Sequence, residues 1–230
     1  MTRPRAWFIS GWSHPAGSLQ PLADRLRDEF DTRCLGLHGP PLDAANPAEA
    51  LAELLSSDPQ PPDLLCGWST GALAALEAAA RRPVPPRLVC ISGTARFLAG
   101  TDRTEGMPPA QLRGLRAALR RDAGAALAGF DAACGCPPAP SFPRPVFPMD
   151  SLIRGLDYLA AADARAVLRD LPPGILWIHG QEDRIIPAAA ARMDARAADH
   201  VVIDPDSGHA LPLVRPGTCA ADIRSWWTAG

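Results

Sequence analysis

The chain has 230 residues, of which 47% are hydrophobic and 21% are charged. A chain of this length can bury one sizeable core but is short for two independent domains, and the composition excludes a disordered segment. The formal net charge of −2 gives no overall attraction to nucleic acid or to an anionic membrane surface, so we expect the protein to bind neither.

The N-terminal residues and the hydropathy of the chain predict a soluble protein. The first apolar run is strand-like and is too short for the core of a signal peptide. No apolar run is long enough to span a bilayer. We therefore expect a cytoplasmic protein, and we expect it to be a monomer.

The cysteines give no sign of a metal centre. Six are present, and a cytoplasmic setting keeps such thiols reduced. Cys66 and Cys90 lie inside apolar strand-like runs, where buried free thiols are common. Cys134 and Cys136 form a C-x-C pair without a second pair or a nearby histidine. We therefore expect no metal site, and the chemistry predicted below requires no cofactor.

Short apolar runs alternate with helical stretches in the first half of the chain. Strands are predicted at residues 7–10, 32–37, 63–66 and 87–92, and helices at residues 17–30, 47–55 and 71–81. Near-continuous apolar strands between helices indicate a parallel sheet that helices cover on both faces. The sequence thus predicts an α/β fold with a mostly parallel, doubly wound sheet.

The alternation breaks off after the fourth predicted strand and resumes later. Residues 97–160 hold helical pieces and a proline-rich stretch but no strand signal. Further along, strands are predicted at residues 174–179 and 200–203, and helices at residues 187–198 and 216–227. A helical insertion after a strand suits a lid. We predict one domain whose core is formed by residues 1–96 and 161–230, with residues 97–160 as a helical lid.

The segment Gly67-Trp68-Ser69-Thr70-Gly71 matches the pattern G-x-S-x-G. The pattern alone is common, but here an apolar strand precedes it and a helix follows it. A sharp strand-to-helix turn strains the central residue and exposes its hydroxyl at the carboxyl edge of the sheet, against the positive end of the next helix. The flanking glycines leave room for close chain approach. The pattern predicts Ser69 as a catalytic nucleophile.

A serine hydroxyl is a poor nucleophile at neutral pH, so a base must lie within hydrogen-bond reach. His209 lies in a loop between the last predicted strand and the last predicted helix, and that loop returns to the same sheet edge as Ser69. We therefore predict His209 as the base. The other histidines lie in strands or in early loops and are interpreted as structural or as residues at the rim of the cleft: His14, His38, His179 and His200.

The base needs an acid that fixes its tautomer and stabilises the imidazolium. Asp183 follows a predicted strand at the carboxyl edge and gives the chain order Ser, Asp, His that this arrangement uses. Glu182 next to it is an alternative. Asp204 and Asp206 are further candidates, but they lie so close to His209 in sequence that a different loop path would be required. We favour Asp183.

The oxyanion of an acyl-transfer reaction needs backbone N–H donors, which are worth roughly 3 kcal/mol each. Thr70, the residue after the nucleophile, supplies one. The second is expected from the loop after the first strand, where Gly11, Trp12 and Ser13 lie. We predict Trp12 as the second donor. Its glycine neighbour and loop position favour a role in the substrate pocket over one in the core.

These residues resemble those of the α/β-hydrolase superfamily over the whole chain, and more narrowly those of the pimeloyl-[acyl-carrier protein] methyl ester esterases of biotin synthesis. The matching pieces are residues 11–12, 67–72, 152–159, 163–165, 180–187 and 207–212. The resemblance implies the α/β-hydrolase fold with an inserted helical lid and carboxylester hydrolysis without a metal or an organic cofactor. Ser10 stands where relatives often have histidine, which changes a supporting contact and not the backbone donor.

The resemblance also implies an acyl channel and a carrier protein. In that family a lid phenylalanine and the residues after it line the channel, and the matching residues are Phe130, Asp131, Ala132, Ala133 and Cys134, with Trp12 as the other wall. The family cuts a methyl ester at the far end of a pimeloyl chain on an acidic carrier protein, which docks on lid arginines. Ala125 and Gly129 stand at the positions of those arginines.

A different set of arginines could form a basic surface on the predicted lid in place of the arginines missing at residues 125 and 129. Their spacing puts them on one side of a helix: Arg113, Arg116, Arg120 and Arg121. Leu112, Leu115 and Leu119 repeat on a neighbouring face. Such a helix packs its leucines on the core and presents its arginines outward, to phosphate and carboxylate groups. We interpret the arginines as a contact for the carrier protein, with an ordinary solvated face as the alternative.

The sequence predicts a carboxylester hydrolase that forms an acyl-enzyme on Ser69, with the methyl ester of pimeloyl-[acyl-carrier protein] as the expected substrate. A generic short-chain carboxylesterase or thioesterase is the alternative, because the same core serves other acyl compounds when the pocket and the lid change. A non-catalytic binding protein with this fold is a remote alternative, since the serine, the aspartate and the histidine are all in place.

Overall fold

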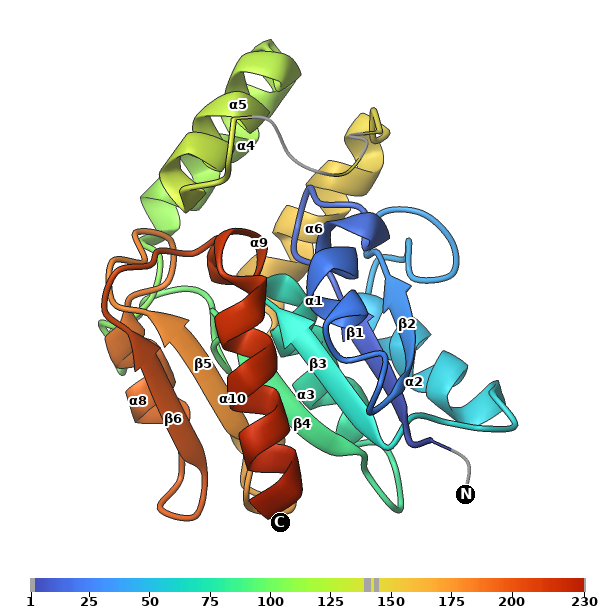
Figure 1. Cartoon of the computed structure of the whole chain (residues 1–230). Coiled ribbons are helices and arrows are strands. Elements are labelled where there is room, and N and C mark those ends of the chain that lie inside the picture. The colour runs from blue at the N-terminus through green and yellow to red at the C-terminus, as the bar shows by residue number, and fades with distance from the viewer. Residues whose placement is uncertain (1–2, 139–141, 143–144, 230) are drawn as a thin grey trace.

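A sheet of six parallel strands forms the centre of the molecule (Figure 1). The computed structural model describes residues 3–138, 142 and 145–229. The strands are β1 (Arg5–Ile9), β2 (Asp31–Leu35), β3 (Leu64–Trp68), β4 (Arg87–Ile91), β5 (Leu176–Gly180) and β6 (His200–Asp204). Their spatial order is β2-β1-β3-β4-β5-β6, and neighbouring strands are parallel throughout. The predicted α/β fold with a parallel sheet is confirmed.

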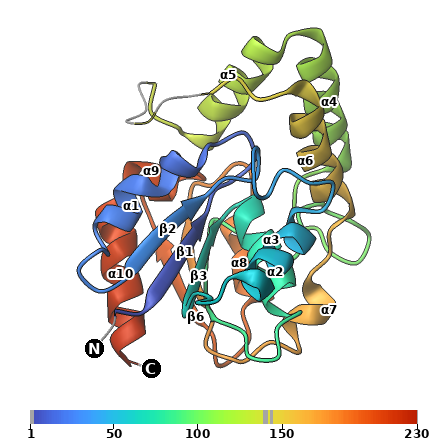
Figure 2. The same ribbon diagram turned by 90° about the vertical axis from the view of Figure 1, so that its right-hand side faces the viewer.

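The strands are apolar on both faces because helices cover both. Leu65 of β3 faces one core cluster and Cys66 faces the other, as the alternation of side chains along a strand requires. Each face has its own helices (Figure 2): α2 (Pro47–Ser57) and α3 (Thr70–Ala79) on one, and α1 (Gln20–Asp24) and α10 (Pro216–Ala229) on the other. The core therefore has two layers, separated by the sheet.

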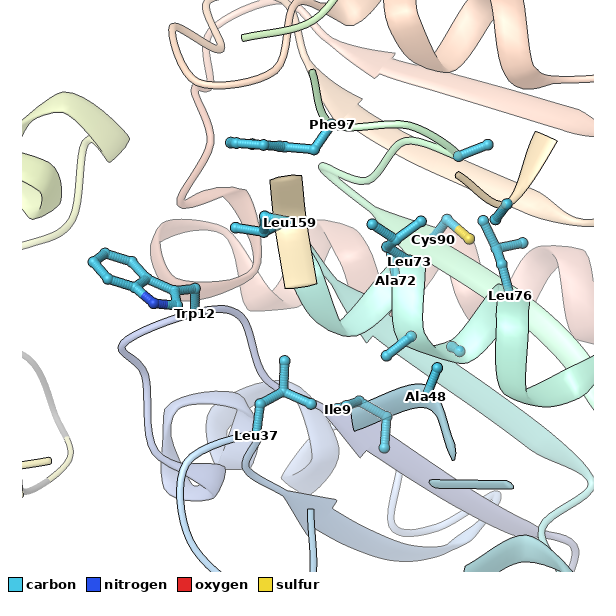
Figure 3. Packing of buried hydrophobic residues seen from close by; sticks show 14 of the residues in the cluster. Ile9, Trp12, Leu37, Ala48, Ala72, Leu73, Leu76, Cys90, Phe97 and Leu159 are labelled. Atoms are coloured by element: carbon cyan, nitrogen blue, oxygen red, sulfur yellow. The ribbon is translucent and has the colours of Figure 1, made fainter. Parts of the chain in front are cut away.

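The larger core cluster continues from the sheet into the helices inserted after β4 (Figure 3). Ile9 of β1, Leu73 of α3 and Cys90 of β4 belong to it, and so do Trp12 and Leu159. All five are buried. The inserted segment therefore shares a hydrophobic core with the sheet.

Two helices are shorter than predicted. The stretch predicted as one helix at residues 17–30 forms a 3₁₀ turn (Ala16–Leu19), the short helix α1, and turns in which backbone N–H groups bond three residues back. Helix α8 (Ala188–Asp194) ends before residue 198, because the Asp199 carboxylate binds the N–H group of Arg196 and holds the chain in a loop. Two further short helices are α7 (Arg165–Leu168) and α9 (Leu211–Val214).

Three inserted helices lie beyond the carboxyl ends of the strands (Figure 1): α4 (Pro109–Arg121), α5 (Ala123–Cys134) and α6 (Met149–Ala161). Helix α4 packs along α5 and also contacts α6. Within the described part of residues 97–160 there are isolated bridges but no strand, as predicted. Residues 139–141 and 143–144 of the proline-rich stretch lie outside the described residues. No described helix combines the length and the apolar character that a membrane span requires.

Candidate active site

Ser69 lies in the turn that joins β3 to α3. Its backbone has φ 57° and ψ −120°, and a positive φ is rare for residues other than glycine. The Ser69 N–H donates to the carbonyl of Ile91 at 2.9 Å, and the Ser69 carbonyl accepts the N–H of Ala72 at 2.9 Å. The strained turn places the hydroxyl at the carboxyl edge of the sheet and at the N-terminus of α3, where partial positive charge favours an anion.

The glycines around Ser69 are required by close backbone contacts. A Cβ on Gly67 would lie 2.4 Å from the backbone of α3, and one on Gly71 would lie 2.3 Å from the carbonyl oxygen of Ile9. A Cβ on Gly11, in the loop after β1, would lie 3.2 Å from the Cβ of Ser69. The absence of side chains at these positions lets α3 pack against β1 and β3 and lets the loop after β1 approach the hydroxyl.

The structure brings Ser69, His209 and Asp183 together at this edge. The distance from Ser69 Oγ to His209 Nε2 is 2.8 Å, and the distance from His209 Nδ1 to Asp183 Oδ2 is also 2.8 Å. All three residues are buried. When Nδ1–H donates to the carboxylate, Nε2 keeps its lone pair and can accept the serine proton. The arrangement can therefore activate the hydroxyl for attack on a carbonyl carbon.

Four hydrogen bonds hold the carboxylate of Asp183. Oδ1 accepts the N–H groups of Ile185 and Ile186 at 2.8 Å each, while Oδ2 accepts from His209 at 2.8 Å and from His179 at 3.0 Å. Burial alone would raise the pKa of Asp183, but the electrostatic interaction with His209 and the hydrogen bonds from both histidines outweigh burial and hold that pKa well below its usual range. Asp183 is therefore ionised at neutral pH.

His179 belongs to this site, although the sequence favoured a structural role for it. The residue is fully buried in β5, and its Nε2 lies 2.8 Å from the Ile186 carbonyl oxygen and 3.0 Å from Asp183 Oδ2. Both partners can only accept, so Nε2 carries the hydrogen. The close spacing of His179 and Asp183 around the end of a strand is the signal that could have pointed to this contact.

The alternative acids lie elsewhere. The side chain of Glu182 is exposed. Asp204 is ion-paired with Arg215 at 3.0 Å, and the exposed Asp206 lies 3.3 Å from the same guanidinium group. Among the described residues, the carboxylate that contacts His209 is that of Asp183.

The loop after β1 runs beside the nucleophile. The order of the strands changes direction between β1 and β3, which is where ligand crevices form in open α/β sheets. Ser10 Oγ donates to the carbonyl of His14 at 2.8 Å, and His14 Nδ1 donates to the carbonyl of Trp12 at 2.9 Å, so the loop is braced internally. Trp12 and Thr70, the predicted oxyanion donors, both line the cavity at Ser69.

A narrow apolar cavity of about 10 Å³, enough for about one water molecule, adjoins Ser69. Leu112, Phe130 and Leu159 of the inserted segment line it together with Trp12 and Ile185 of the core. The rings of Trp12 and Phe130 meet edge to face with their centroids 4.9 Å apart. The lining next to Ser69 is therefore apolar, as suits an acyl chain, and these side chains must move apart to admit one.

The residues that follow Phe130 are placed differently. Ala132 and Ala133 are exposed, Asp131 and Cys134 are buried, and none of the four is among the described residues that line the cavity. The helical period of α5 turns Asp131 and Ala132 away from the face that carries Phe130, whereas Ala133 and Cys134 lie one turn further along on the same side of the helix. The Cys134 carbonyl instead accepts the N–H of Ala210 at 2.9 Å, which fastens the end of α5 to the loop of His209.

The arginines predicted to contact a carrier protein lie on α4. Leu112 and Leu119 of this helix are buried against the core, as predicted. Arg116 forms an ion pair with Asp157 of α6. The remaining three are exposed: Arg113, Arg120 and Arg121. Helix α4 is thus amphipathic, with three arginine side chains directed to solvent and one engaged within the insertion.

The fold places a histidine beside the C-x-C pair, although none lies near the pair in the sequence. His14 Nε2 lies 3.6 Å from Cys136 Sγ and 3.7 Å from Asp131 Oδ1. His14 is distant in sequence, but the fold brings the loop after β1 to the end of α5. A contact of this kind leaves no local signal in the sequence.

Comparison with known proteins places this geometry in a family. The model of the alpha/beta hydrolase family matches residues 8–222. A pimeloyl-[acyl-carrier protein] methyl ester esterase from Stenotrophomonas maltophilia (strain R551-3) is 34% identical over 214 residues, which cover 85% of this chain and 80% of the relative. The protein of the same name from Xanthomonas campestris pv. campestris (strain B100) is 32% identical over 225 residues, covering 90% and 88%.

Solved structures agree with the fold. An esterase from Exiguobacterium antarcticum superposes with a TM-score of 0.84 at 16% identity, covering 99% of this chain and 93% of the other. A hydrolase from Pseudomonas aeruginosa PA01 has a TM-score of 0.81 at 20% identity, covering 98% and 90%. The family match over most of the length and the relatives above 30% identity agree with the architecture described above. The chain therefore belongs to the alpha/beta hydrolase family.

Proposed function

We propose that this protein is a serine carboxylester hydrolase whose substrate is the methyl ester of pimeloyl-[acyl-carrier protein]. The family match and the names of its relatives support an esterase of the alpha/beta hydrolase fold. The observation that carries the catalytic proposal is the pair of 2.8 Å contacts that link Ser69 Oγ to His209 and His209 to Asp183.

In the first half of the proposed reaction, Ser69 Oγ attacks the ester carbonyl carbon while His209 Nε2 takes its proton. The carbonyl oxygen becomes an anion that accepts hydrogen bonds from the backbone N–H groups of Trp12 and Thr70. The intermediate then collapses, the bond to the methoxy group breaks, and His209 gives its proton to the departing methanol. Asp183 stays ionised throughout and stabilises the imidazolium.

In the second half, water attacks the acyl ester on Ser69. His209 takes a proton from the water as its oxygen bonds to the carbonyl carbon, and the same two N–H groups bind the second oxyanion. The bond to Ser69 Oγ breaks, and His209 returns the proton to the serine. The products are a free carboxylic acid and the regenerated enzyme, so each proton transfer is accounted for by His209.

The narrower substrate is supported by the relatives, the cavity and the surface charge. The relatives are named for this methyl ester, and they share most of their length with this chain. The apolar lining between Trp12 and Phe130 suits the methylene groups of an acyl chain. The exposed guanidinium groups of α4 suit an acidic carrier protein, because complementary charge steers association.

A fluorophosphonate probe tests the catalytic proposal, because it labels serines activated by a base. We expect the wild-type protein to be labelled and Ser69→Ala to remain unlabelled, with kcat reduced by at least about 10⁴-fold. Ser57→Ala, at the exposed C-terminal end of α2, is the matched control and should behave as wild type. An unlabelled wild-type protein would support a non-catalytic binding protein.

Comparative kinetics test the substrate. We expect kcat/KM for methyl pimeloyl ester on the carrier protein to exceed that for free p-nitrophenyl esters by about 100-fold or more, since discrimination reflects contacts made in the transition state. The gene should also restore growth of a biotin-requiring strain that lacks its methyl ester esterase. Equal or higher values for the free esters, without rescue, would favour a generic short-chain esterase or thioesterase.

A further inference from the structure

An imidazole, a carboxylate and a thiol converge where the loop after β1 meets the end of α5. His14 Nε2 lies 3.6 Å from Cys136 Sγ and 3.7 Å from Asp131 Oδ1. One potential ligand atom of each residue lies within 4.8 Å of those of the other two. His14 is buried, Asp131 is nearly so, and Cys136 is partly accessible. We refer to these three residues as the His14 cluster.

The hydrogen bond of the imidazole determines which of its nitrogens faces the cluster as an acceptor. His14 Nδ1 lies 2.9 Å from the carbonyl oxygen of Trp12, and a carbonyl oxygen can only accept. Nδ1 therefore carries a hydrogen, and in the neutral ring the lone pair is on Nε2, the nitrogen that faces Cys136 and Asp131. Histidines at metal centres are commonly arranged in this way: one ring nitrogen donates its N–H to a backbone carbonyl, and the other faces the metal and its further ligands.

Two of the three spacings between the ligand atoms are close to those of a tetrahedral site, and the third, between Cys136 Sγ and the carboxylate of Asp131, is within 4.8 Å. Zn²⁺ bonds to imidazole at about 2.0–2.1 Å and to thiolate at about 2.3 Å, which puts neighbouring corners of a tetrahedron about 3.3–3.6 Å apart. The observed 3.6 and 3.7 Å need only small shifts.

We propose that His14, Asp131 and Cys136 bind a divalent zinc ion, with a fourth position open to water. Imidazole, thiolate and carboxylate together favour zinc over calcium or magnesium, which prefer oxygen ligands alone. Binding replaces the thiol hydrogen of Cys136 with the metal and releases a proton to solvent. The bound ion joins the loop that carries Trp12 to the end of α5, so it restrains the insertion over the cavity and lowers the rate of ester hydrolysis.

Cobalt(II) is the spectroscopic probe for this site, because thiolate ligation gives an intense charge-transfer band. The full chain, without an affinity tag and in a phosphine reductant, should bind one equivalent of Co²⁺ with this band, and Zn²⁺ should displace it. Cys136→Ser should lose the band and bind Zn²⁺ at least about 100-fold more weakly. Cys34→Ser, which changes another partly accessible cysteine, should retain both properties. A band that persists in Cys136→Ser, or is missing from the wild type, would overturn the site.

A protection experiment keeps the proposal testable in the wild-type protein alone. Zn²⁺ should slow maleimide labelling of Cys136, identified by peptide mapping, without slowing that of Cys34. Zn²⁺ should also inhibit hydrolysis of a fluorogenic ester by the wild type, but not by Cys136→Ser, whose side chain lies outside the cavity lining. Equal inhibition of both proteins would overturn the restraining role. The binding measurements do not depend on the proposed function, so failure of either proposal can be recognised separately.

Discussion

At the scale of single residues, the Asp183 carboxylate is held between two imidazoles, those of His209 and His179. His179→Leu keeps most of the buried volume but removes the N–H donor to Asp183 Oδ2. We expect kcat to fall about 10-fold with little change in KM, because a hydrogen bond to a charged group is worth about 1.5–3 kcal/mol. His179→Gln retains a donor and should recover part of the loss in steady-state kinetics. Wild-type kcat in the leucine variant would show that His179 only fills the core.

His38 makes the stability of the fold sensitive to acid. Its Nδ1 donates to Ser151 Oγ at 2.9 Å, the Ser151 hydroxyl donates to Asp43 at 2.8 Å, and burial lowers the pKa of His38 from 6.5 to about 4. Because the unfolded chain binds this proton more readily, the contribution of neutral His38 is complete above pH 6.5 and is lost as the pH falls towards 4.

We therefore expect the free energy of unfolding of wild type to drop between pH 7 and pH 5 by about 2 kcal/mol more than that of His38→Gln. Urea titrations at the two pH values measure this difference. The glutamine variant can be less stable at both pH values through its altered contact with Ser151, but the dependence on pH is the quantity compared. Parallel losses in the two proteins would contradict a buried, neutral His38.

At the scale of elements, the loop after β1 and the turn into α3 approach each other at Gly11. Gly11→Ala places a methyl group 3.2 Å from the Cβ of Ser69 and must displace the loop that carries Trp12. Misplacement by about 1 Å can cost about 100-fold in rate, so we expect kcat for a free ester to fall by 10- to 100-fold with the circular dichroism spectrum retained.

Gly114→Ala in α4 is the matched control. A Cβ at Gly114 meets no atom within 4 Å, so this variant should keep wild-type kcat and gain up to about 1 kcal/mol in stability, because alanine favours a helix. Full activity of Gly11→Ala would argue against the proposed oxyanion role of the loop after β1.

The elements that were predicted well are those with local signals. The strands follow apolar runs, and Ser69 follows from a motif flanked by a strand and a helix. His209 and Asp183 were placed by their position after strands, because parallel strands end at one edge. The helix that ends at Asp194 was predicted too long, because Asp199 binds backbone groups that include the N–H of Gly174, distant in sequence. Contacts between residues that are distant in sequence leave no local pattern, and for this reason the contact of His14 with Cys136 could not be predicted either.

At the scale of the whole molecule, the proposed function requires an acidic carrier protein to bind despite the net charge of −2, and we propose that the exposed arginines of α4 attract it. Reversing Arg113, Arg120 and Arg121 to glutamate should raise KM for the carrier-borne ester at least about 10-fold and leave KM for a free ester unchanged. Concentrated salt should reduce this difference, because the screening length falls to about 3 Å at 1 M.

The same reversal at three exposed arginines away from α4 changes the net charge equally and serves as the control: Arg27, Arg169 and Arg192. We expect it to leave KM for the carrier-borne ester near the wild-type value. Similar increases in both triple variants would show that overall charge, and not a docking surface on α4, governs association.

The hydrogen bond from the Ala210 N–H to the Cys134 carbonyl fixes one end of the inserted helices to the loop of His209. This end of α5 is tethered beside the base, while the bend between α4 and α5 lies farthest from the sheet (Figure 1). We expect the outer bend to move and the tethered end to act as a pivot, and the proposed zinc ion would make this pivot stiffer. Movement of the outer bend would then open the space between the insertion and the sheet without breaking the contact between His209 and Ser69. A large substrate could enter while the catalytic residues stay in place.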